Sequence, residues 1–138
     1  GISMQQWMQQ QLAAWQSQIH FHGWAAYADL PSYLEQTAIV VIPSLFESFS
    51  YVCAEAMGAG RAIVGSTQGA MPELLQNDAG LLANPKSPRQ IAKAINRFIE
   101  NPELRRQMGE KARARVQEAY NEQVIGEQME KLYEQVSW

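Results

Sequence analysis

Two glutamates, Glu47 and Glu55, lie eight positions apart in the stretch PSLFESFSYVCAEAMGAG, residues 43–60. Each carboxylate can accept hydrogen bonds from neutral hydroxyl groups. A helix that begins near Ser50 leaves unpaired backbone N–H groups and the positive end of its dipole between the two glutamates. Such a helix end accepts a phosphate without help from cations. The spacing therefore favours a ligand built from hydroxyls, phosphate and hydroxyls, which is the shape of a nucleotide sugar.

A structural role is the alternative for an isolated pair at this spacing. Glu47 would then stabilise the positive end of the helix through its charge. Glu55 would be a solvated side chain on the surface of the same helix. The residues around the pair have to decide between the two interpretations.

The apolar pattern along the chain predicts the elements that position this stretch. Continuous apolar runs at 38–44 and 61–66 are typical of strands covered on both faces, and shorter strand patterns occupy 19–23 and 80–84. Helical patterns fill most of the remaining chain, with predicted starts at Tyr51, Pro72, Pro88 and Pro102, and they include 4–15 and a final helix through Val136.

Strands that alternate with helices predict an α/β fold, a Rossmann-like three-layer sandwich with a mostly parallel sheet. Ligands of such sheets bind at the carboxyl ends of the strands. The turn that contains Glu47 directly follows the strand predicted at 38–44, which we expect to be the most buried one. The two glutamates thus lie where a ligand site is expected.

Composition and charge limit the classes of function. With 138 residues and 46% hydrophobic residues, the chain fits one domain, residues 1–138, of which 1–3 are typical of a cloning remnant. The formal charge of −3 argues against nucleic acid as a partner, and all 11 Lys and Arg occur from Arg61 onward. The one cysteine, Cys53, fits a small buried residue in a cytoplasmic protein. No apolar run reaches the roughly 20 residues of a transmembrane segment.

The stretch and its surroundings resemble a known family. Residues 43–85 follow the pattern P-S-x-x-E-x-F-G-x-x-x-x-E-A-M-A-x-G, then an apolar strand, then G-G-x-P-E and N-G-x-L, and the segment ENPELRRQMGEKARARV (100–116) matches the closing part. From about Ile19 to the end, the chain resembles the C-terminal half of a retaining, GT-B-type glycosyltransferase of group 1 (family 4). The resemblance implies a partial GT-B C-terminal domain that binds a nucleotide-diphosphate sugar.

The resemblance also implies roles for individual residues. Glu47 matches the glutamate that bonds hydroxyls of the transferred sugar near the anomeric carbon, which makes it the catalytic candidate as a positioning group. Glu55 matches the glutamate that holds the ribose hydroxyls. The backbone N–H groups between them match the segment that faces the sugar and the distal phosphate. The donor-binding residues implied are Ser44, Glu47, Phe49, Ser50, Tyr51, Val52 and Glu55.

The sequence departs from the family pattern at Ser50, where glycine is usual. The backbone at this position must therefore avoid a positive φ, or serine must tolerate one. Parts of the family that are absent from this chain matter more. The Arg and Lys that grip the diphosphate, and the N-terminal acceptor domain, have no match. We expect the resulting open strand edge either to be closed by pairing of 19–23 with 38–44, or to pair with a second copy in a homodimer.

No cofactor or metal is implied. His20 and His22 share one face of a predicted strand, but they lack a third ligand nearby, and a structural role is favoured. We therefore predict a glycosyltransferase domain that transfers its sugar with retention in the intact parent and is inactive alone. The parent is expected in the cytoplasm, with peripheral membrane association left open. The alternatives are a non-catalytic α/β binding or interaction module and a sugar-nucleotide epimerase of the same fold.

Overall fold

The computed structural model describes residues 1–136, which divide into two compact units, Gly1–Leu30 and the chain from Pro31 onward. The first unit contains helix α1 (Met4–Gln11), the 3-10 helix η1 (Ala13–Gln18) and the short 3-10 turn η2 (Tyr27–Asp29). A capping box begins α1: the Ser3 hydroxyl accepts from the Gln6 N–H at 3.2 Å, and the Gln6 side chain accepts from the Ser3 N–H at 2.8 Å.

The strand predicted at 19–23 is wrong, because these residues form no strand. The expected closure of the sheet by pairing of 19–23 with 38–44 is therefore also wrong. An alternating run of five residues gains little as an isolated strand, since its backbone groups need a neighbouring strand as partner. His20 and His22 consequently share no strand face.

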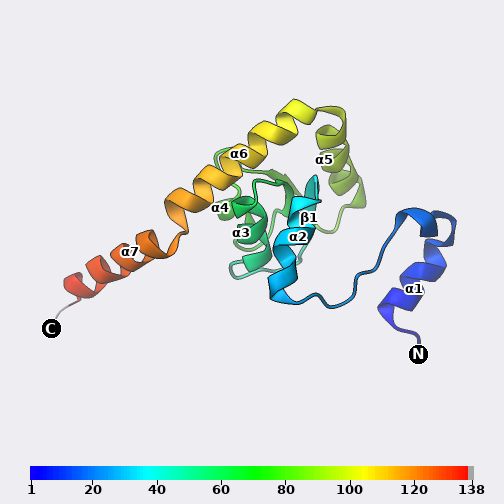
Figure 1. Ribbon diagram of the computed structural model, residues 1–138, viewed down its shortest axis with the longest axis horizontal. Coiled ribbons are helices and arrows are strands. Elements are labelled where there is room, and N and C mark those ends of the chain that lie inside the picture. Colours follow the sequence, from blue (N-terminus) through cyan, green and yellow to red (C-terminus); the bar gives the residue numbers. More distant parts are fainter. Residues whose placement is uncertain (137–138) are drawn as a thin grey trace. The chain divides into compact units, whose positions relative to one another are not determined.

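The second unit, whose helices and strand β1 are labelled in Figure 1, is built on a parallel sheet. This sheet has three strands in the order β1-β2-β3. The strands are β1 (Ile39–Ile42), β2 (Ala62–Ser66) and β3 (Leu81–Ala83). In the register of the sheet, Val41 pairs with Val64 and Val64 pairs with Leu81. These three strands confirm the predictions at 38–44, 61–66 and 80–84, and the parallel order confirms the predicted α/β class.

Helices precede, connect and follow the strands. They are α2 (Leu30–Glu35), α3 (Tyr51–Gly58), α4 (Met71–Leu74), α5 (Pro88–Glu100), α6 (Pro102–Ala119) and α7 (Glu122–Gln135). The last three helices each begin directly after a capping side chain, Ser87, Asn101 or Asn121. Ser87 caps α5 through the Gln90 N–H at 3.4 Å, and Asn101 caps α6 through the Leu104 N–H at 3.0 Å, each directly before a proline.

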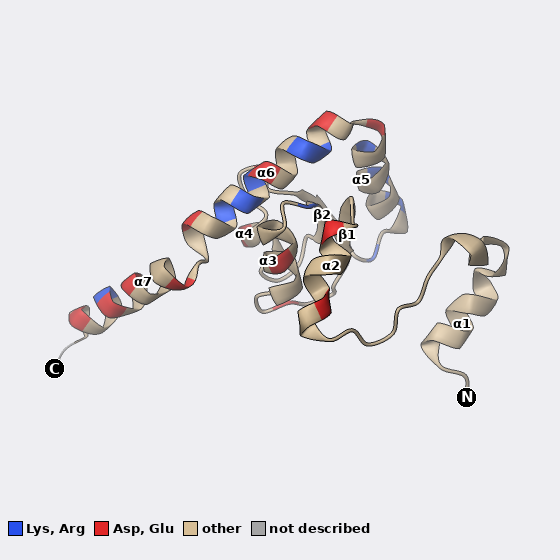
Figure 2. Ribbon diagram, viewed as in Figure 1, with Lys and Arg blue, Asp and Glu red and all other residues tan. Residues whose placement is uncertain are grey.

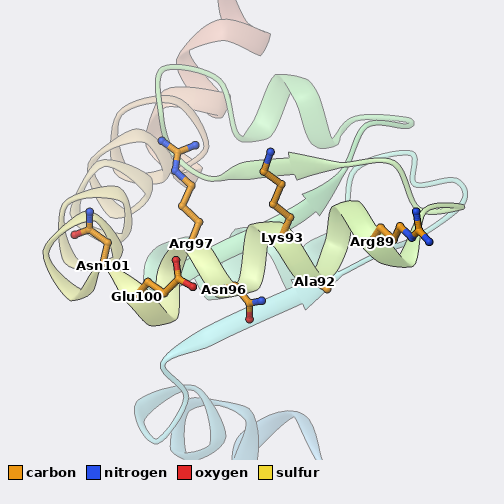
Figure 3. A pocket seen from close by; sticks show the side chains of 7 residues that line it. All are labelled: Arg89, Ala92, Lys93, Asn96, Arg97, Glu100 and Asn101. Atoms are coloured by element: carbon orange, nitrogen blue, oxygen red, sulfur yellow. The ribbon is translucent and has the colours of Figure 1, made fainter.

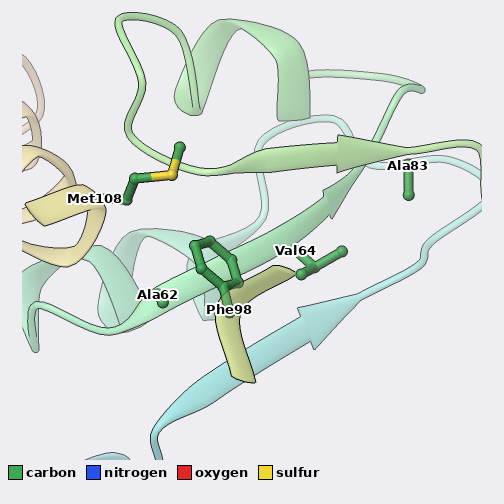
Figure 4. Close-up of a cluster of buried hydrophobic side chains, with 5 residues drawn as sticks. All are labelled: Ala62, Val64, Ala83, Phe98 and Met108. Atoms are coloured by element: carbon green, nitrogen blue, oxygen red, sulfur yellow. The ribbon is translucent and has the colours of Figure 1, made fainter. Parts of the chain in front are cut away.

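The core lies around β2, whose five residues are all buried. One face of the sheet packs Ala62, Val64 and Ala83 against Phe98 of α5 and Met108 of α6 (Figure 4). On the other face, a Cβ built on Gly65 would lie 2.5 Å from Cδ1 of Leu75, at the end of α4. Helix α3 contacts both α4 and β2, so it shares this second face. The result is a sheet covered by helices on both sides.

The prediction that the strand before the glutamates is the most buried one is wrong. In β1 only Ile42 is buried, and Val41 is 37% exposed. The physical reason is position: within residues 1–136, β1 forms one edge of the sheet and pairs with β2 alone. Its free edge carries four uncharged apolar residues, which leaves it without the charges that commonly protect edge strands. Pairing of this edge with a second copy stays a prediction.

The positive charges gather on α5 and α6, while α1 carries no charged residue (Figure 2). They are not all solvated. Arg61 donates to the carbonyl oxygens of Ala59 and Thr37 at 2.9 and 3.3 Å, and it thereby ties the turn before β2 to the end of α2. Arg106 lies on the surface between Glu103 and Glu110. Among the described residues, no helix has the length and apolar character that crossing a membrane requires.

Candidate functional site

Three loops follow the carboxyl ends of the parallel strands: 43–50 after β1, 67–70 after β2 and 84–87 after β3. The first of these, the β1–α3 loop, contains most of the predicted site residues. Parallel strands direct their carboxyl ends to the same edge of the sheet, which gathers the three loops there. A depression of about 280 Å³ marks this edge, lined by Leu45, Gln68, Asn84, Pro85 and Lys86.

Glu47 is half-buried and is held through both its side chain and its backbone. The Ser44 hydroxyl donates to Oε1 of Glu47 at 2.8 Å, and the Ala70 N–H donates to the Glu47 carbonyl oxygen at 3.0 Å. Gly69 makes this approach possible. Its φ is +61°, and a Cβ at this position would lie 2.3 Å from the Glu47 carbonyl oxygen. Glu47 is therefore held at its carboxylate by the loop after β1 and at its backbone by the loop after β2, and Oε2 stays available for a ligand.

Ser50, the residue before α3, adopts the left-handed conformation with φ 76° and ψ 83°. Serine thus tolerates the positive φ that the family's usual glycine would adopt more easily. Its carbonyl oxygen accepts from the N–H groups of Cys53 and Ala54 at 3.1 and 3.2 Å. The N–H groups of Tyr51 and Val52 donate to no group of the described chain, so the first turn of α3 presents free donors.

Replacing Ser50 with glycine is expected to stabilise the protein by about 1 kcal/mol. A non-glycine residue in the left-handed conformation costs about 1–3 kcal/mol. Glycine removes this strain, and the greater conformational entropy of glycine in the unfolded chain offsets only part of the gain. Urea denaturation followed by far-UV circular dichroism measures the change. Ser48→Gly is the matched control in the same loop. Because Ser48 has no positive φ, this variant should be less stable than wild type. A less stable Ser50→Gly variant would contradict the assigned strain.

The remaining predicted site residues lie on both sides of this helix start. The Phe49 ring is half-buried, whereas Tyr51 and Val52 are 77% and 51% exposed. Glu55 lies one turn inside α3, half-buried, and its carboxylate has no hydrogen-bond partner among the described residues. The structure therefore joins Ser44 and Glu47 directly, and it places Glu55 on the same helix start without a contact between the two glutamates.

Cys53 is buried in α3 close to Glu47. Burial, with a smaller contribution from the negative charge of Glu47, raises the pKa of the Cys53 thiol to about 12. The thiol therefore stays protonated at neutral pH and supplies no nucleophile. This confirms the structural role predicted for Cys53.

A larger concavity of about 720 Å³ lies on the outer side of α5 and contains none of the predicted site residues (Figure 3). In the close-up, Lys93 and Arg97 extend to the same side of the helix, and Asn96 extends to the other. Its lining consists of charged and amide side chains on the exposed face of α5 and at Asn101, with Ala92 as the only apolar member. Size alone therefore does not identify the site in this fold. No group of three or more metal-ligating side chains occurs among residues 1–136.

Sequence reasoning missed the residues that hold the β1–α3 loop from outside. Gly69 and Ala70 belong to the second glycine pattern of the family, but only the structure shows that they support the backbone of Glu47. Arg115 lies on α6 and contacts the end of α4, and Tyr120 directly follows α6 and contacts Phe49. No sequence pattern indicated either contact. The Arg115 guanidinium is bound to the carbonyl oxygens of Leu74 and Glu73 at the end of α4 and is not a purely solvated charge.

Comparison with known proteins supplies the family. The family described as "Glycosyl transferases group 1" matches residues 4–115, which include β1, β2, β3 and both glutamates. The chain belongs to this family. Within it, the chain corresponds to the C-terminal GT-B domain of larger relatives, as the fold class predicted.

Two curated relatives of this glycosyltransferase domain are enzymes named for sugar transfer. The MMP α-(1→4)-mannosyltransferase of Mycolicibacterium hassiacum is 30% identical over 84% of the chain, and the D-inositol 3-phosphate glycosyltransferase of Streptomyces griseus is 31% identical over 72% of it. The chain spans only 29% and 21% of their respective lengths.

Solved structures agree with the assignment of the domain. The C-terminal domain of the group 1 glycosyltransferase LpcC from Francisella tularensis superimposes with a TM-score of 0.74 at 27% identity, covering 86% of this chain and 63% of that one. HepE of Anabaena, determined in complex with UDP-glucose, superimposes with a TM-score of 0.82 at 24% identity over 95% of this chain and 36% of its own. At that identity the likeness to HepE establishes the fold.

Proposed function

We propose that this chain is the donor-binding domain of a glycosyltransferase and that it binds a nucleotide-diphosphate sugar at the start of α3. The observation that carries the proposal is the make-up of this helix start: the free N–H donors of Tyr51 and Val52 come in the chain between two half-buried glutamates, Glu47 and Glu55. Successive N–H groups beside a left-handed residue such as Ser50 form the kind of concavity that binds anions. The UDP-glucose held by HepE supports a uridine nucleotide as the first ligand to test.

Each part of the site has a proposed task. The N–H groups and the dipole of α3 hold the distal phosphate and stabilise the negative charge that develops on the diphosphate as it leaves. Glu47 accepts hydrogen bonds from hydroxyls of the transferred sugar, and its link to Ser44 keeps the carboxylate in one orientation. Glu55 accepts hydrogen bonds from the ribose hydroxyls. Ser44 and Phe49 shape the floor and the wall of the site.

The complete reaction is a proposal for a larger protein. Because the chain spans under a third of its first curated relatives, we propose that a separate acceptor-binding domain completes the enzyme. In that enzyme the sugar is transferred with retention of anomeric configuration, and the isolated chain binds donor without transferring it. We further propose a cytoplasmic enzyme, consistent with the single cysteine, which excludes an internal disulfide.

Titration of the isolated chain with UDP-, GDP- and ADP-glucose tests the proposal. Amide signals in ¹H–¹⁵N spectra report on each segment, and we expect those of residues 50–55 to shift with one of the three donors. Signals of the C-terminal half of α5, which packs against the other face of the sheet, are an internal control, because they should not move. A chain whose residues 50–55 respond to none of the donors at millimolar concentration would instead be the non-catalytic module that we considered as the alternative.

A further inference from the structure

The Phe49 ring of the β1–α3 loop is packed between two tyrosines. Its centroid lies 5.4 Å from that of Tyr51 and 5.8 Å from that of Tyr120, with interplanar angles of 70° and 68°. Both are edge-to-face pairs, the arrangement that aromatic quadrupoles favour. Tyr51 belongs to the site itself, whereas Tyr120 comes from the far end of α6. The only aromatic contact that reaches this loop from another part of the fold is thus made by Tyr120, within the described residues.

Arg115 holds Tyr120 in place. One guanidinium nitrogen, Nη2, donates to the Tyr120 hydroxyl at 3.2 Å, and the guanidinium carbon lies 5.5 Å from the centre of the ring. The same guanidinium donates to the carbonyl oxygens of Leu74 and Glu73 at 2.9 and 2.8 Å. These carbonyls end α4, where a cation is electrostatically favourable. Tyr120 is consequently anchored to α4 through one side chain.

The contacts close into a ring around the site. Helix α4 begins directly after Ala70, whose N–H donates to the Glu47 carbonyl oxygen at 3.0 Å. The chain from Glu47 runs on to Phe49, which packs on Tyr120, and Tyr120 returns through Arg115 to α4. The β1–α3 loop is therefore tied to α4 at two points. Ala70, the residue before α4, binds Glu47, and Arg115 and Tyr120 connect the end of α4 to Phe49. The left-handed Ser50 directly follows Phe49, the second of these two supported residues.

We propose that Tyr120, held by Arg115, is a positioning residue of the donor site. Its ring keeps Phe49 in one orientation and thereby keeps Ser50 in the conformation that leaves the N–H groups of Tyr51 and Val52 facing the ligand. Tyr120 acts through Phe49 and does not touch the ligand. The effect on donor binding rests on the proposed function, whereas the link between Tyr120 and the loop can be measured without a ligand.

The location of Tyr120 gives the link a wider consequence. Tyr120 ends α6, and the next residue, Asn121, caps α7 by accepting from the Val124 N–H at 2.9 Å. The joint between α6 and α7 is therefore adjacent to the residue that supports the loop. A movement of α7 about this joint would reach Phe49 through one side-chain contact.

The test compares Tyr120→Leu, Tyr120→Phe and the control Tyr133→Leu, in which an exposed tyrosine of α7 is lost. In spectra without ligand, Tyr120→Leu is expected to shift the amide signals of residues 48–52 and to leave those of β2 unchanged. Tyr120→Phe keeps the ring against Phe49 and should shift them far less. Loop signals in Tyr120→Leu that match those of Tyr133→Leu would overturn the proposal.

Two further measurements separate the positioning role of Tyr120 from a loss of folding and from a failure of the proposed function. If Tyr120→Leu loses the dispersed signals of β2, Arg115→Lys replaces it, since lysine cannot reproduce the forked contacts of Arg115, and unchanged loop signals again overturn the proposal. With the donor that binds wild type, Tyr120→Leu is expected to lower affinity about two- to tenfold. Shifted loop signals with unaltered affinity would remove the positioning role. Wild type that binds no nucleotide sugar contradicts the proposed function alone.

Discussion

Replacing Glu55 with alanine is expected to weaken binding of both UDP and UDP-glucose, whereas Glu47→Ala is expected to weaken binding of UDP-glucose only. Glu55 is proposed to hold the ribose, which both ligands contain. Glu47 is proposed to hold the sugar, which UDP lacks. A hydrogen bond to a charged group contributes about 1.5–3 kcal/mol, so each loss should amount to about 10- to 100-fold in affinity.

Isothermal titration with the two ligands measures the difference, and GDP or ADP ligands replace them if the chain prefers another base. Glu118→Ala is the charge-matched control, because Glu118 is an exposed carboxylate on α6. Equal losses for both ligands in Glu47→Ala would contradict its assignment to the sugar. In the intact enzyme the same Glu47→Ala substitution is expected to abolish transfer, and an unchanged rate would overturn the catalytic role.

Gly109→Ala is expected to destabilise the domain by about 3 kcal/mol, a large loss for a buried one-methyl insertion. Gly109 is buried in α6, where a Cβ would lie 2.3 Å from the Gly60 carbonyl oxygen and 3.1 Å from the Gly60 carbonyl carbon. These are backbone atoms of a turn that is itself fixed, since Gly60 has φ +68° and its N–H donates to the Met57 carbonyl oxygen at 2.9 Å. Neither side can move away without separating α6 from α3.

Gly126→Ala in α7 is the matched control for this substitution. A Cβ on Gly126 meets no atom within 4 Å, so alanine should there add up to about 1 kcal/mol of helix stability. Urea denaturation followed by far-UV circular dichroism measures both changes. A Gly109→Ala variant as stable as wild type would show that the close approach of α6 to Gly60 is not required.

Local pattern predicted most of the second unit. Short apolar runs bounded by turn signals are typical of strands in a parallel sheet, and β1, β2 and β3 all lie within the predicted ranges. The starts of α5 and α6 were equally predictable, because a capping side chain followed by proline fixes a helix start through local contacts alone. The strand predicted at 19–23 was wrong because a strand needs a neighbouring strand as partner, and the local sequence does not show whether one is present.

The position of the site was predictable, but its construction was not. Glu47, Ser50 and Glu55 are close in the sequence, so the helix start that carries them could be inferred from spacing and from the family resemblance. The supports of the site come from Gly69, Ala70, Arg115 and Tyr120, which follow later in the chain and are brought to the loop by the tertiary fold.

The sequence by itself determined the class of the fold, the family and the candidate ligand groups, because these depend on residue types at short spacing. Only the tertiary structure decided which strand is buried, how serine accommodates a positive φ at position 50, and what holds Glu47 and Phe49. Burial depends on a strand's place in the sheet order, and contacts across long separations depend on packing geometry. Neither property is encoded in the local pattern of any one segment.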